Sequence, residues 1–532
     1  MDAYSICCTS PSARNTSKIY QDLWSTRLHT QVDLGQDRLL RKLATMEGFR
    51  QRWKGDLASK PHVAVVGAGL AGLRCADILL QHGFRVTIIE ARNRVGGRLH
   101  QEVLPNGRLA DVGPNWIHGT NDNPMLDLAK QTNTAVGSWD LTSCVFDEDG
   151  ELFTVEDGEK YSDVMWQIVQ DAFKHSNNSS QDIDPKESLH DFFVQKVAEK
   201  IPSTEKDHER KRKIVMQISE LWGAFVGSPI YRQSLKFFWL EECIEGGKFE
   251  AEPKVLDAVA KPAIEGAEIK FQTKVERISY RTDPEDKAKV QVNGGQTLEF
   301  DEVVVTAPLG WLKRNLAAFE PALPARLTKA IGAIGYGCLE KVYITFPKAF
   351  WLAREGDDRK AQGFVQWLSP NYVTESNPKR WNQEVVELAS LTPETSHPTL
   401  LFYTYGEQSQ YLTGQLSELS DPRKKDEFLL NFFRPYYSRL PHFSETDPDC
   451  KPTGFMATDW LHDELAGFGS YSNFQVGLEE GDTDIRTMRE GLPDHGLWLA
   501  GEHTAPFVGL GTATGAYWSD LAAGWALYMG LQ

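Results

Sequence analysis

The sequence predicts an α/β fold with a discontinuous Rossmann-like domain. A short apolar run at 62–66 is followed by a glycine-rich turn and a helical stretch, and a second apolar strand follows at 85–90. This order is typical of a βαβ unit. Similar apolar strands recur far along the chain, at 301–306 and 496–500. Because parallel strands buried on both faces are nearly continuous apolar runs, we expect these segments to build one domain, with a second domain inserted between them.

Length and charge set limits on the classes of function. A chain of 532 residues suggests about two to four domains. There are 57 Lys and Arg residues and 74 Asp and Glu residues, so the formal charge is 57 − 74 = −17. This excess of acid argues against nucleic acid as the main ligand, which requires a basic face. It suits a cationic substrate, because an acidic field concentrates cations, and it equally suits plain solubility.

The cysteines and the ends of the chain bear on the compartment. The seven cysteines are scattered without CxxC spacing, which is typical of a reducing compartment and predicts no metal site. The N-terminus has no basic region followed by an apolar run, and no stretch of about 20 apolar residues occurs. We therefore expect a cytoplasmic protein without a membrane span.

The segment 67–72, GAGLAG, predicts a dinucleotide site because it follows a strand and opens a helix. Gly67 permits the tight turn, Gly69 lets the backbone approach a pyrophosphate, and Gly72 lets helix and strand pack closely. The diphosphate is expected at the positive end of the helix. Glu90, 18 residues beyond Gly72, ends the second strand, where its carboxylate can accept hydrogen bonds from a ribose diol.

The residues after Glu90 favour FAD over NAD. The sequence ARNRVGGR at 91–98 adds a second glycine pair and three arginines. Guanidinium groups at this point can clamp a diphosphate whose other half turns into the protein interior. A nicotinamide enzyme does not need them.

Together with these residues, five further segments make the chain resemble the flavin-containing amine oxidases, which include monoamine oxidases, polyamine oxidases and flavin-type histone lysine demethylases. They are DVGPNWIHG (111–119), VTAPLGWLK (305–313), EKVYITF (340–346), GSYS (469–472) and AGEHT with GTATGAY (500–504, 511–517). The resemblance covers the chain from Pro61 onward and is closest to soluble polyamine-oxidase-like members. It implies an FAD-binding domain and an α+β substrate-binding domain. The boundaries that we expect are 61–120, 251–320 and 484–532 for the first, 121–250 and 321–483 for the second, and 1–60 for an N-terminal extension.

The resemblance also implies which residues bind FAD. Those assigned to the cofactor are Gly67, Gly69, Ala71, Gly72, Glu90, Arg92 and Arg98 for the ADP half, Val275 for the adenine, Glu502 for the ribityl chain, and Asn115, Trp116, Thr512 and Ala513 for the flavin ring. A helix beginning near Thr512 would stabilise negative charge on reduced flavin. Ser470 occupies the position of the cysteine that bonds the flavin in monoamine oxidases, so we expect non-covalent FAD.

The implied reaction residues are Lys341, which reaches flavin N5 through a water in this family, and His118, which contacts the substrate amine or acts as a weak base. Tyr471 corresponds to one wall of an aromatic cage that attracts an amine. Thr512 replaces the opposite tyrosine, which widens the channel. His118 is alternatively a core histidine, and Lys341 a lysine on an exposed strand. Trp460 packs either near the flavin or in the core.

The expected function is oxidation of a C–N bond of a polyamine or related amine to an imine, with molecular oxygen reduced to hydrogen peroxide. A tailoring oxidase of secondary metabolism is the alternative, because Gly246-Gly247 leads to Lys248-Phe249 instead of the family's Gly-Tyr pair. An amino-acid oxidase and a flavin-binding partner protein with little turnover rank below it. The absence of a long heptad run argues against the histone demethylases.

Overall fold

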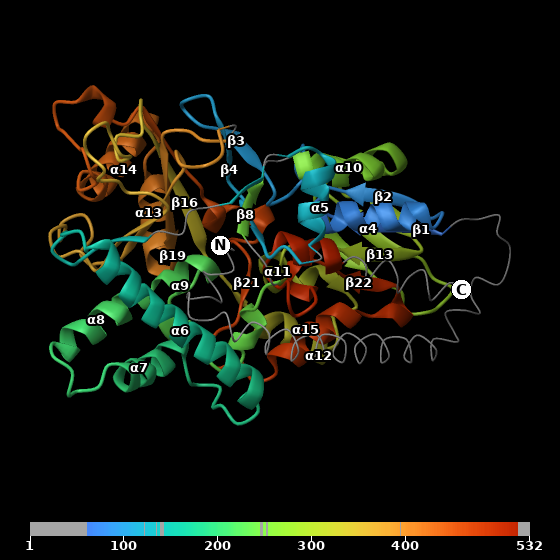
Figure 1. Cartoon of the computed structure of the whole chain (residues 1–532). Helices are drawn as coiled ribbons and strands as arrows, with labels where there is room; N and C mark the ends of the chain where they lie inside the picture. The colour runs from blue at the N-terminus through green and yellow to red at the C-terminus, as the bar shows by residue number, and fades with distance from the viewer. Residues whose placement is uncertain are drawn as a thin grey trace.

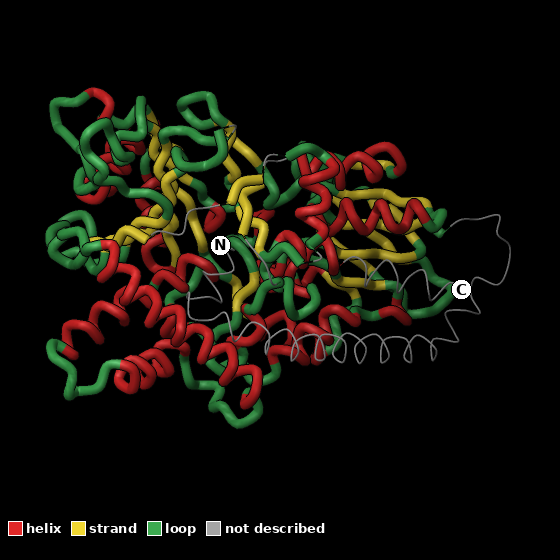
Figure 2. Tube along the Cα trace, in the orientation of Figure 1, coloured by secondary structure: helices red, strands yellow, loops and turns green. Residues whose placement is uncertain are grey.

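The computed structural model describes residues 61–519, except 122, 135, 139–142, 245–247, 252–253 and 394. The predicted N-terminal extension, 1–60, lies outside the described residues. Strands gather in two separate regions, each flanked by helices (Figure 2). One region holds a parallel sheet and the other a larger mixed sheet.

The parallel sheet joins segments from distant parts of the chain. Its strand order is β22-β13-β1-β2-β9, and all neighbouring pairs are parallel. The strands are β1 (His62–Val66), β2 (Arg85–Ile89), β9 (Glu268–Lys270), β13 (Glu302–Val305) and β22 (Leu497–Leu499). The α/β fold with a discontinuous Rossmann-like sheet is therefore confirmed, while the domain boundaries remain predictions.

Helices cover both faces of this sheet (Figure 1). Val63 and Val65 face one side, where they pack with α4 (Leu70–Gln81), α5 (Pro124–Gln131) and α10 (Lys254–Gly266). Ala64 and Val66 face the other side, toward α12 (Ala325–Ala333) and α15 (Gly481–Glu490). Alternate residues of one strand are thus buried in two different cores, which explains why HVAVV at 62–66 is apolar throughout.

The second large sheet has the strand order β20-β16-β19-β18-β17-β7. Its pairs are antiparallel except for β17 with β7, which is parallel. The strands are β7 (Ser143–Phe146), β16 (Leu339–Thr345), β17 (Phe364–Trp367), β18 (Gln383–Glu387), β19 (Thr399–Tyr405) and β20 (Gly454–Ala457). One face is covered by α14 (Pro422–Tyr437) and α13 (Gly406–Glu418), through an aromatic core that includes Phe402 and Phe433.

The other face of the six-stranded sheet lies toward helices at one end and toward the 111–116 segment at the other. The helices are α6 (Val155–Ser179), α7 (Leu189–Lys200), α8 (His208–Ser219) and α9 (Leu221–Val226). Val145 packs among them. Tyr343 and Tyr403 pack instead with Trp116. This face therefore connects helices α6 to α9 with the region near the parallel sheet.

Smaller elements complete the fold. A four-stranded sheet has the order β12-β11-β10-β14, and three short sheets pair β3 with β4, β15 with β21, and β5 with β8 and β6. Their bounds are β3 (Gln101–Val103), β4 (Leu109–Asp111), β5 (Trp116–His118), β6 (Val136–Ser138), β8 (Lys248–Ala251), β10 (Val275–Ser279), β11 (Ala288–Val292), β12 (Thr297–Phe300), β14 (Phe319–Glu320), β15 (Gly335–Tyr336) and β21 (Ser472–Asn473), with the helix α11 (Leu309–Arg314).

One expectation from the sequence about local structure is wrong in part. The Asn- and Ser-rich stretch from His175 suggests a loop, but α6 continues to Ser179. Ser176 there is fully buried and its hydroxyl donates to the Lys236 carbonyl, so tertiary contacts override weak helix propensity. The last helix begins at Ala513, as expected from the start predicted near Thr512, and the Thr512 hydroxyl accepts the Gly515 N–H and caps the first turn.

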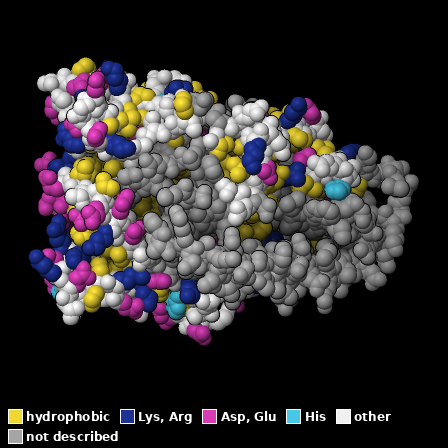
Figure 3. Space-filling view, viewed as in Figure 1, with side chains coloured by type: hydrophobic (Ala, Val, Ile, Leu, Met, Phe, Trp, Pro, Cys, Tyr) yellow, Lys and Arg dark blue, Asp and Glu magenta, His cyan; other side chains and the backbone are white. Residues whose placement is uncertain are grey.

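The surface carries charges of both signs. On the face seen in Figure 3, Lys and Arg side chains lie among Asp and Glu side chains over the described part of the molecule. Among the helices of the described residues, none is long and apolar enough to cross a bilayer.

Candidate active site

The glycine turn leaves open space at the N-terminus of α4. Gly67 has φ +106°, and a Cβ on Gly72 would lie 2.0 Å from the Gly67 carbonyl oxygen, so both positions require glycine. A Cβ on Gly69 would meet nothing within 4 Å. Gly69 is also the N-cap of α4 and supplies no side-chain cap, so the first helical N–H groups face this space. The arrangement is suited to an anion.

Glu90 and Arg92 lie beside this turn. The Glu90 carboxylate accepts the N–H of Ala68 and the N–H of Arg92, each at 2.7 Å. Arg92 in turn forms an ion pair with Asp463 at 2.7 Å. The acid predicted to bind a ribose therefore also fixes the conformation of the glycine turn, because it accepts the backbone N–H of Ala68 within that turn.

Arg98 and Glu502, predicted to serve the two halves of the dinucleotide, form a buried ion pair. Arg98 donates to the Glu502 carboxylate at 3.0 Å and to the Ser470 carbonyl at 2.7 Å. Burial alone would raise the pKa of Glu502, but Arg98 and the Ser472 hydroxyl lower it below its usual value. This carboxylate is therefore ionised at neutral pH, and it joins motifs that are 404 residues apart.

Lys341 points from β16 into the segment that follows β4. Its ammonium donates to the Asp111 carbonyl at 2.8 Å, to the Asn115 side-chain oxygen at 2.9 Å and to the Gly113 carbonyl. The residue is 4% exposed. Lys341 is therefore not a lysine on an exposed strand, and two of the predicted site residues, Lys341 and Asn115, are in direct contact.

Tyr403 extends this network and was missed by sequence reasoning. Its hydroxyl donates to the Asn115 side chain at 3.1 Å and accepts the Trp116 indole N–H at 2.9 Å. Trp116 also stacks on Phe364, with ring centroids 6.2 Å apart. The predicted flavin-lining residues Asn115 and Trp116 are thus held by side chains of the six-stranded sheet. The alternation of TLLFYTY at 399–405 predicts a strand, but its partner strands cannot be read from it.

Tyr471 and Thr512, predicted as opposite walls of a cage, lie near each other. The Tyr471 ring is 3.4 Å from the position of a Cβ on Gly511, the neighbour of Thr512. The Tyr471 hydroxyl donates to the Phe225 carbonyl of α9 at 2.6 Å. Burial, with a further contribution from Glu241, raises the pKa of Tyr471, so the ring stays neutral.

The other predicted residues lie on defined elements. Ala71 is buried in the first turn of α4, and Val275 begins β10. His118 is half-buried at the end of β5. The Trp460 indole donates to the Val112 carbonyl at 3.1 Å, which places it against the same segment as Lys341. Ala513 begins the last helix.

These features are matched by a family model. The flavin containing amine oxidoreductase model matches residues 70–519. The chain belongs to the flavin-containing amine oxidase family. A second model, that of the pyridine nucleotide-disulphide oxidoreductases, matches residues 26–105, the part that holds the glycine turn. The resemblance stated from the sequence motifs is confirmed, and this amine oxidase uses FAD.

Curated relatives and solved structures agree with this family. Probable polyamine oxidase 4 of Arabidopsis thaliana is 28% identical over 87% of this chain and 86% of its own length. Lysine-specific histone demethylase 1 homolog 1 of the same plant is 26% identical, and the match covers 84% of this chain but 50% of that protein. A putrescine oxidase solved with putrescine bound superimposes with a TM-score of 0.61 at 20% identity, over 87% of this chain and 98% of that one.

The described residues fit FAD. The open space at Gly69, the uncapped N-terminus of α4 and the ionised Glu502 are the features that a diphosphate and a polyol chain require.

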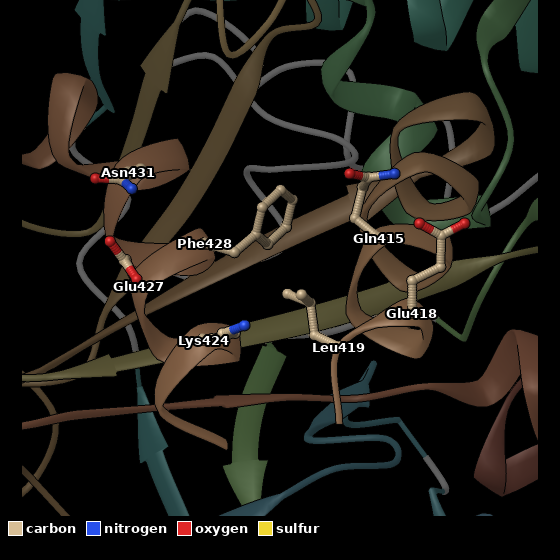
Figure 4. A pocket seen from close by; sticks show the side chains of 7 residues that line it. All are labelled: Gln415, Glu418, Leu419, Lys424, Glu427, Phe428 and Asn431. Atoms are coloured by element: carbon tan, nitrogen blue, oxygen red, sulfur yellow. The ribbon is translucent and has the colours of Figure 1, made fainter. Parts of the chain in front are cut away.

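A separate hollow lies on the outer side of the six-stranded sheet. It has a volume of about 350 Å³ and is formed by α13 and α14, with Phe428 and Leu419 beside Lys424 and Glu418 (Figure 4). None of the predicted site residues lines it. It is therefore distinct from the residues expected to bind FAD.

Proposed function

We propose that this amine oxidase oxidises a C–N bond of a polyamine or a related amine to an imine, which water hydrolyses to an aldehyde and an amine. FAD, when bound, supplies two-electron chemistry, through which the C–H next to nitrogen is oxidised and molecular oxygen is reduced to hydrogen peroxide. The observation that carries the proposal is the buried contact of Lys341 with Asn115 and the carbonyls of Asp111 and Gly113. It places an ammonium group beside the residues that we assign to the flavin.

In this proposal, the Lys341 ammonium exchanges one of its three hydrogen bonds for a bond to the water that attacks the imine. Its three bonds fix the position of Nζ, so the group is positioned without rearrangement of the chain. Tyr403 and Asn115 keep Trp116 in place as a wall. Tyr471 presents a neutral ring to the amine, and burial of the whole region excludes bulk water.

The relatives support an amine substrate. The curated relative from Arabidopsis thaliana is named a probable polyamine oxidase, and the structural neighbour is a putrescine oxidase. His118 is assigned to contact the substrate amine, in agreement with its half-buried position next to Trp116. Non-covalent binding of FAD, with Ser470 in place of a cysteine, belongs to the same proposal.

An anaerobic amine panel tests the proposal. Purified holoenzyme is mixed with spermine, spermidine, N-acetylspermine, putrescine, an arylalkylamine, an indoline and an amino acid, and the flavin absorbance is followed. Bleaching by a polyamine, followed by peroxide release when oxygen is admitted, is expected. Bleaching by the indoline alone identifies the tailoring oxidase, and bleaching by the amino acid alone identifies the amino-acid oxidase. No bleaching by any of them overturns the proposal.

A further inference from the structure

The Lys341 ammonium has three N–H groups, and each of them has an acceptor within the protein. The acceptors are the Asp111 carbonyl at 2.8 Å, the Asn115 side-chain oxygen at 2.9 Å and the Gly113 carbonyl. An ammonium group cannot donate a fourth hydrogen bond. A water can therefore bind here only if one of the three bonds is given up, and the cost depends on which donors the abandoned oxygen keeps.

The three acceptors differ in whether a second donor reaches them. The Asp111 carbonyl also accepts the Tyr343 hydroxyl at 2.8 Å, and the Asn115 oxygen also accepts the Tyr403 hydroxyl at 3.1 Å. Within the described part of the chain, Lys341 alone donates to the Gly113 carbonyl. If Lys341 released this carbonyl, it would have no donor, whereas the other two acceptors would each keep a tyrosine. The bond to Gly113 is therefore the most costly one to exchange.

Both tyrosines lie on the same face of the six-stranded sheet as Lys341. Tyr343 is two residues further along β16, and Tyr403 is directly opposite Lys341 in the pairing of β16 with β19. The Lys341 Nζ atom lies 5.8 Å from the centre of the Tyr403 ring. The two hydroxyl groups therefore reach neighbouring acceptors of one ammonium group from the same side.

The position of the two remaining acceptors favours an exchange at Asn115. The Asp111 carbonyl is part of the backbone at the end of β4. Asn115 instead adjoins Trp116, and both are assigned to the flavin ring, so an N–H group that leaves Asn115 becomes available on the side where the amine reacts. The Tyr403 hydroxyl also accepts the Trp116 indole N–H at 2.9 Å. It can thus hold Asn115 and Trp116 without help from Lys341.

We propose that Tyr403 is a positioning residue that allows Lys341 to exchange its bond to Asn115 for a bond to the attacking water. The bonds to Asp111 and Gly113 keep Nζ in place during the exchange. The water oxygen then adds to the carbon of the neutral imine, the C–N bond breaks, and both water protons end on the departing amine nitrogen, which leaves an aldehyde. The inference rests on the proposed function, because it requires an imine near Lys341.

The test compares Tyr403→Phe with Tyr343→Phe, because each change removes one hydroxyl group from an acceptor of Lys341. After a single anaerobic turnover of spermine, sodium borodeuteride traps remaining imine as labelled amine and hydrolysed product as labelled alcohol. In Tyr403→Phe, imine hydrolysis is expected to slow about tenfold more than flavin reduction does, because Asn115 would lose its last donor if Lys341 left it. Tyr343→Phe is expected to lower the melting temperature and to leave hydrolysis at the wild-type rate.

A double-mutant cycle separates this role from a purely structural one. In a Lys341→Met background there is no bond to exchange, so Tyr403→Phe is expected to cause no further slowing of imine hydrolysis. An equal, additive effect of Tyr403→Phe in both backgrounds would show that the hydroxyl acts independently of Lys341 and would overturn the inference. Equal slowing of hydrolysis in Tyr343→Phe and Tyr403→Phe would also overturn it.

High-resolution crystal structures of the oxidised holoenzyme test the exchange without turnover. In the wild type, a water is expected at Lys341 Nζ in place of Asn115, with the contact to Gly113 intact. In Tyr403→Phe, Lys341 is expected to remain bonded to Asn115 and to bind no water. A wild-type ammonium without a water, or one that has released Gly113, overturns the inference. If no amine is oxidised but the water is present in the wild type and absent from the variant, the proposed function fails and the exchange stands.

Discussion

The Lys341 ammonium and the Asn115 side-chain oxygen lie 2.9 Å apart, although 226 residues separate them in the sequence. Lys341 belongs to the six-stranded sheet, and Asn115 precedes β5 in the segment next to the parallel sheet. This hydrogen bond therefore connects the six-stranded sheet with the segment between β4 and β5, where we place the flavin ring and the amine.

Replacement of Lys341 by methionine is expected to slow flavin reduction or reoxidation by about a hundredfold or more, because the variant loses a positive charge beside the flavin ring that stabilises the negative charge developing on reduced flavin and on oxygen. FAD is expected to remain bound. Stopped-flow absorbance separates the two half-reactions. Lys348→Met, at an exposed position just beyond β16, is the control and should behave as wild type. Unchanged rates in both half-reactions of Lys341→Met would remove this residue from the mechanism.

The glycine turn predicts opposite outcomes for two similar variants. In Gly69→Ala the new methyl group meets open space, so the apoprotein should keep its melting temperature but lose affinity for FAD. In Gly72→Ala the methyl group collides with the Gly67 carbonyl, so folding itself should fail. Flavin content and apoprotein melting temperature distinguish the two cases. Equal FAD affinity in Gly69→Ala and wild type would contradict the assignment of this turn.

Glu502→Gln tests the buried ion pair with Arg98. The change leaves the Arg98 guanidinium, which is 23% exposed, without its counter-charge, and this is expected to lower stability by about 2 kcal/mol and to reduce the bound FAD. The pKa of Glu502 is lowered in the folded protein, so the ionised carboxylate stabilises the wild type fully above pH 4.5 and less as the pH falls below that value. The difference in stability between wild type and variant should therefore be largest above pH 4.5 and shrink at lower pH. Glu464→Gln, which removes an exposed pair with Lys274, should have little effect.

Glu220 predicts a dependence of stability on pH. Burial raises its pKa from 4.5 to about 7, so the folded state binds more protons than the unfolded state between these values, and stability falls as the pH rises through them. Glu220→Gln removes this pH-dependent fall in the free energy of unfolding, which is at most about 3 kcal/mol. The variant should melt at the wild-type temperature at pH 4.5 and above it at pH 8. A constant difference at all pH values would contradict this account.

Non-covalent FAD predicts complete release of the cofactor on denaturation. Ser470 has no thiol to offer, and its hydroxyl accepts the Leu339 N–H at 3.1 Å. After precipitation with acid, all yellow absorbance should appear in the supernatant and none in the pellet. Flavin fluorescence retained in the denatured polypeptide band would show a covalent bond and contradict this expectation.

Much of the FAD-binding half could be predicted because its signals are local. The strand at 62–66, the turn at 67–72 and the acid at position 90 lie within one βαβ unit, whose spacing is fixed by backbone geometry. The boundaries of β1 and β2 differ from the expected ones by one residue at most.

A row of four polar side chains crosses the six-stranded sheet and could not be predicted in the same way. Its members are Lys341, Tyr403, Glu384 and Gln366. Its members come from four strands, and which residues face each other depends on register across three strand pairs. A shift of one residue in any pair would turn a side chain to the opposite face. β16, β18 and β19 each contain more than one polar residue, so a strand taken alone does not show which of them joins the row.

The origin of the parallel sheet in distant segments has a consequence for biosynthesis. β13 acquires its outer neighbour only when β22, almost two hundred residues later, has left the ribosome. Until then a hydrophobic strand with unpaired backbone groups is exposed on the nascent polypeptide, which invites aggregation and chaperone capture. A premature stop codon anywhere before position 497 should therefore yield insoluble material, even though most of the catalytic side chains have already been translated.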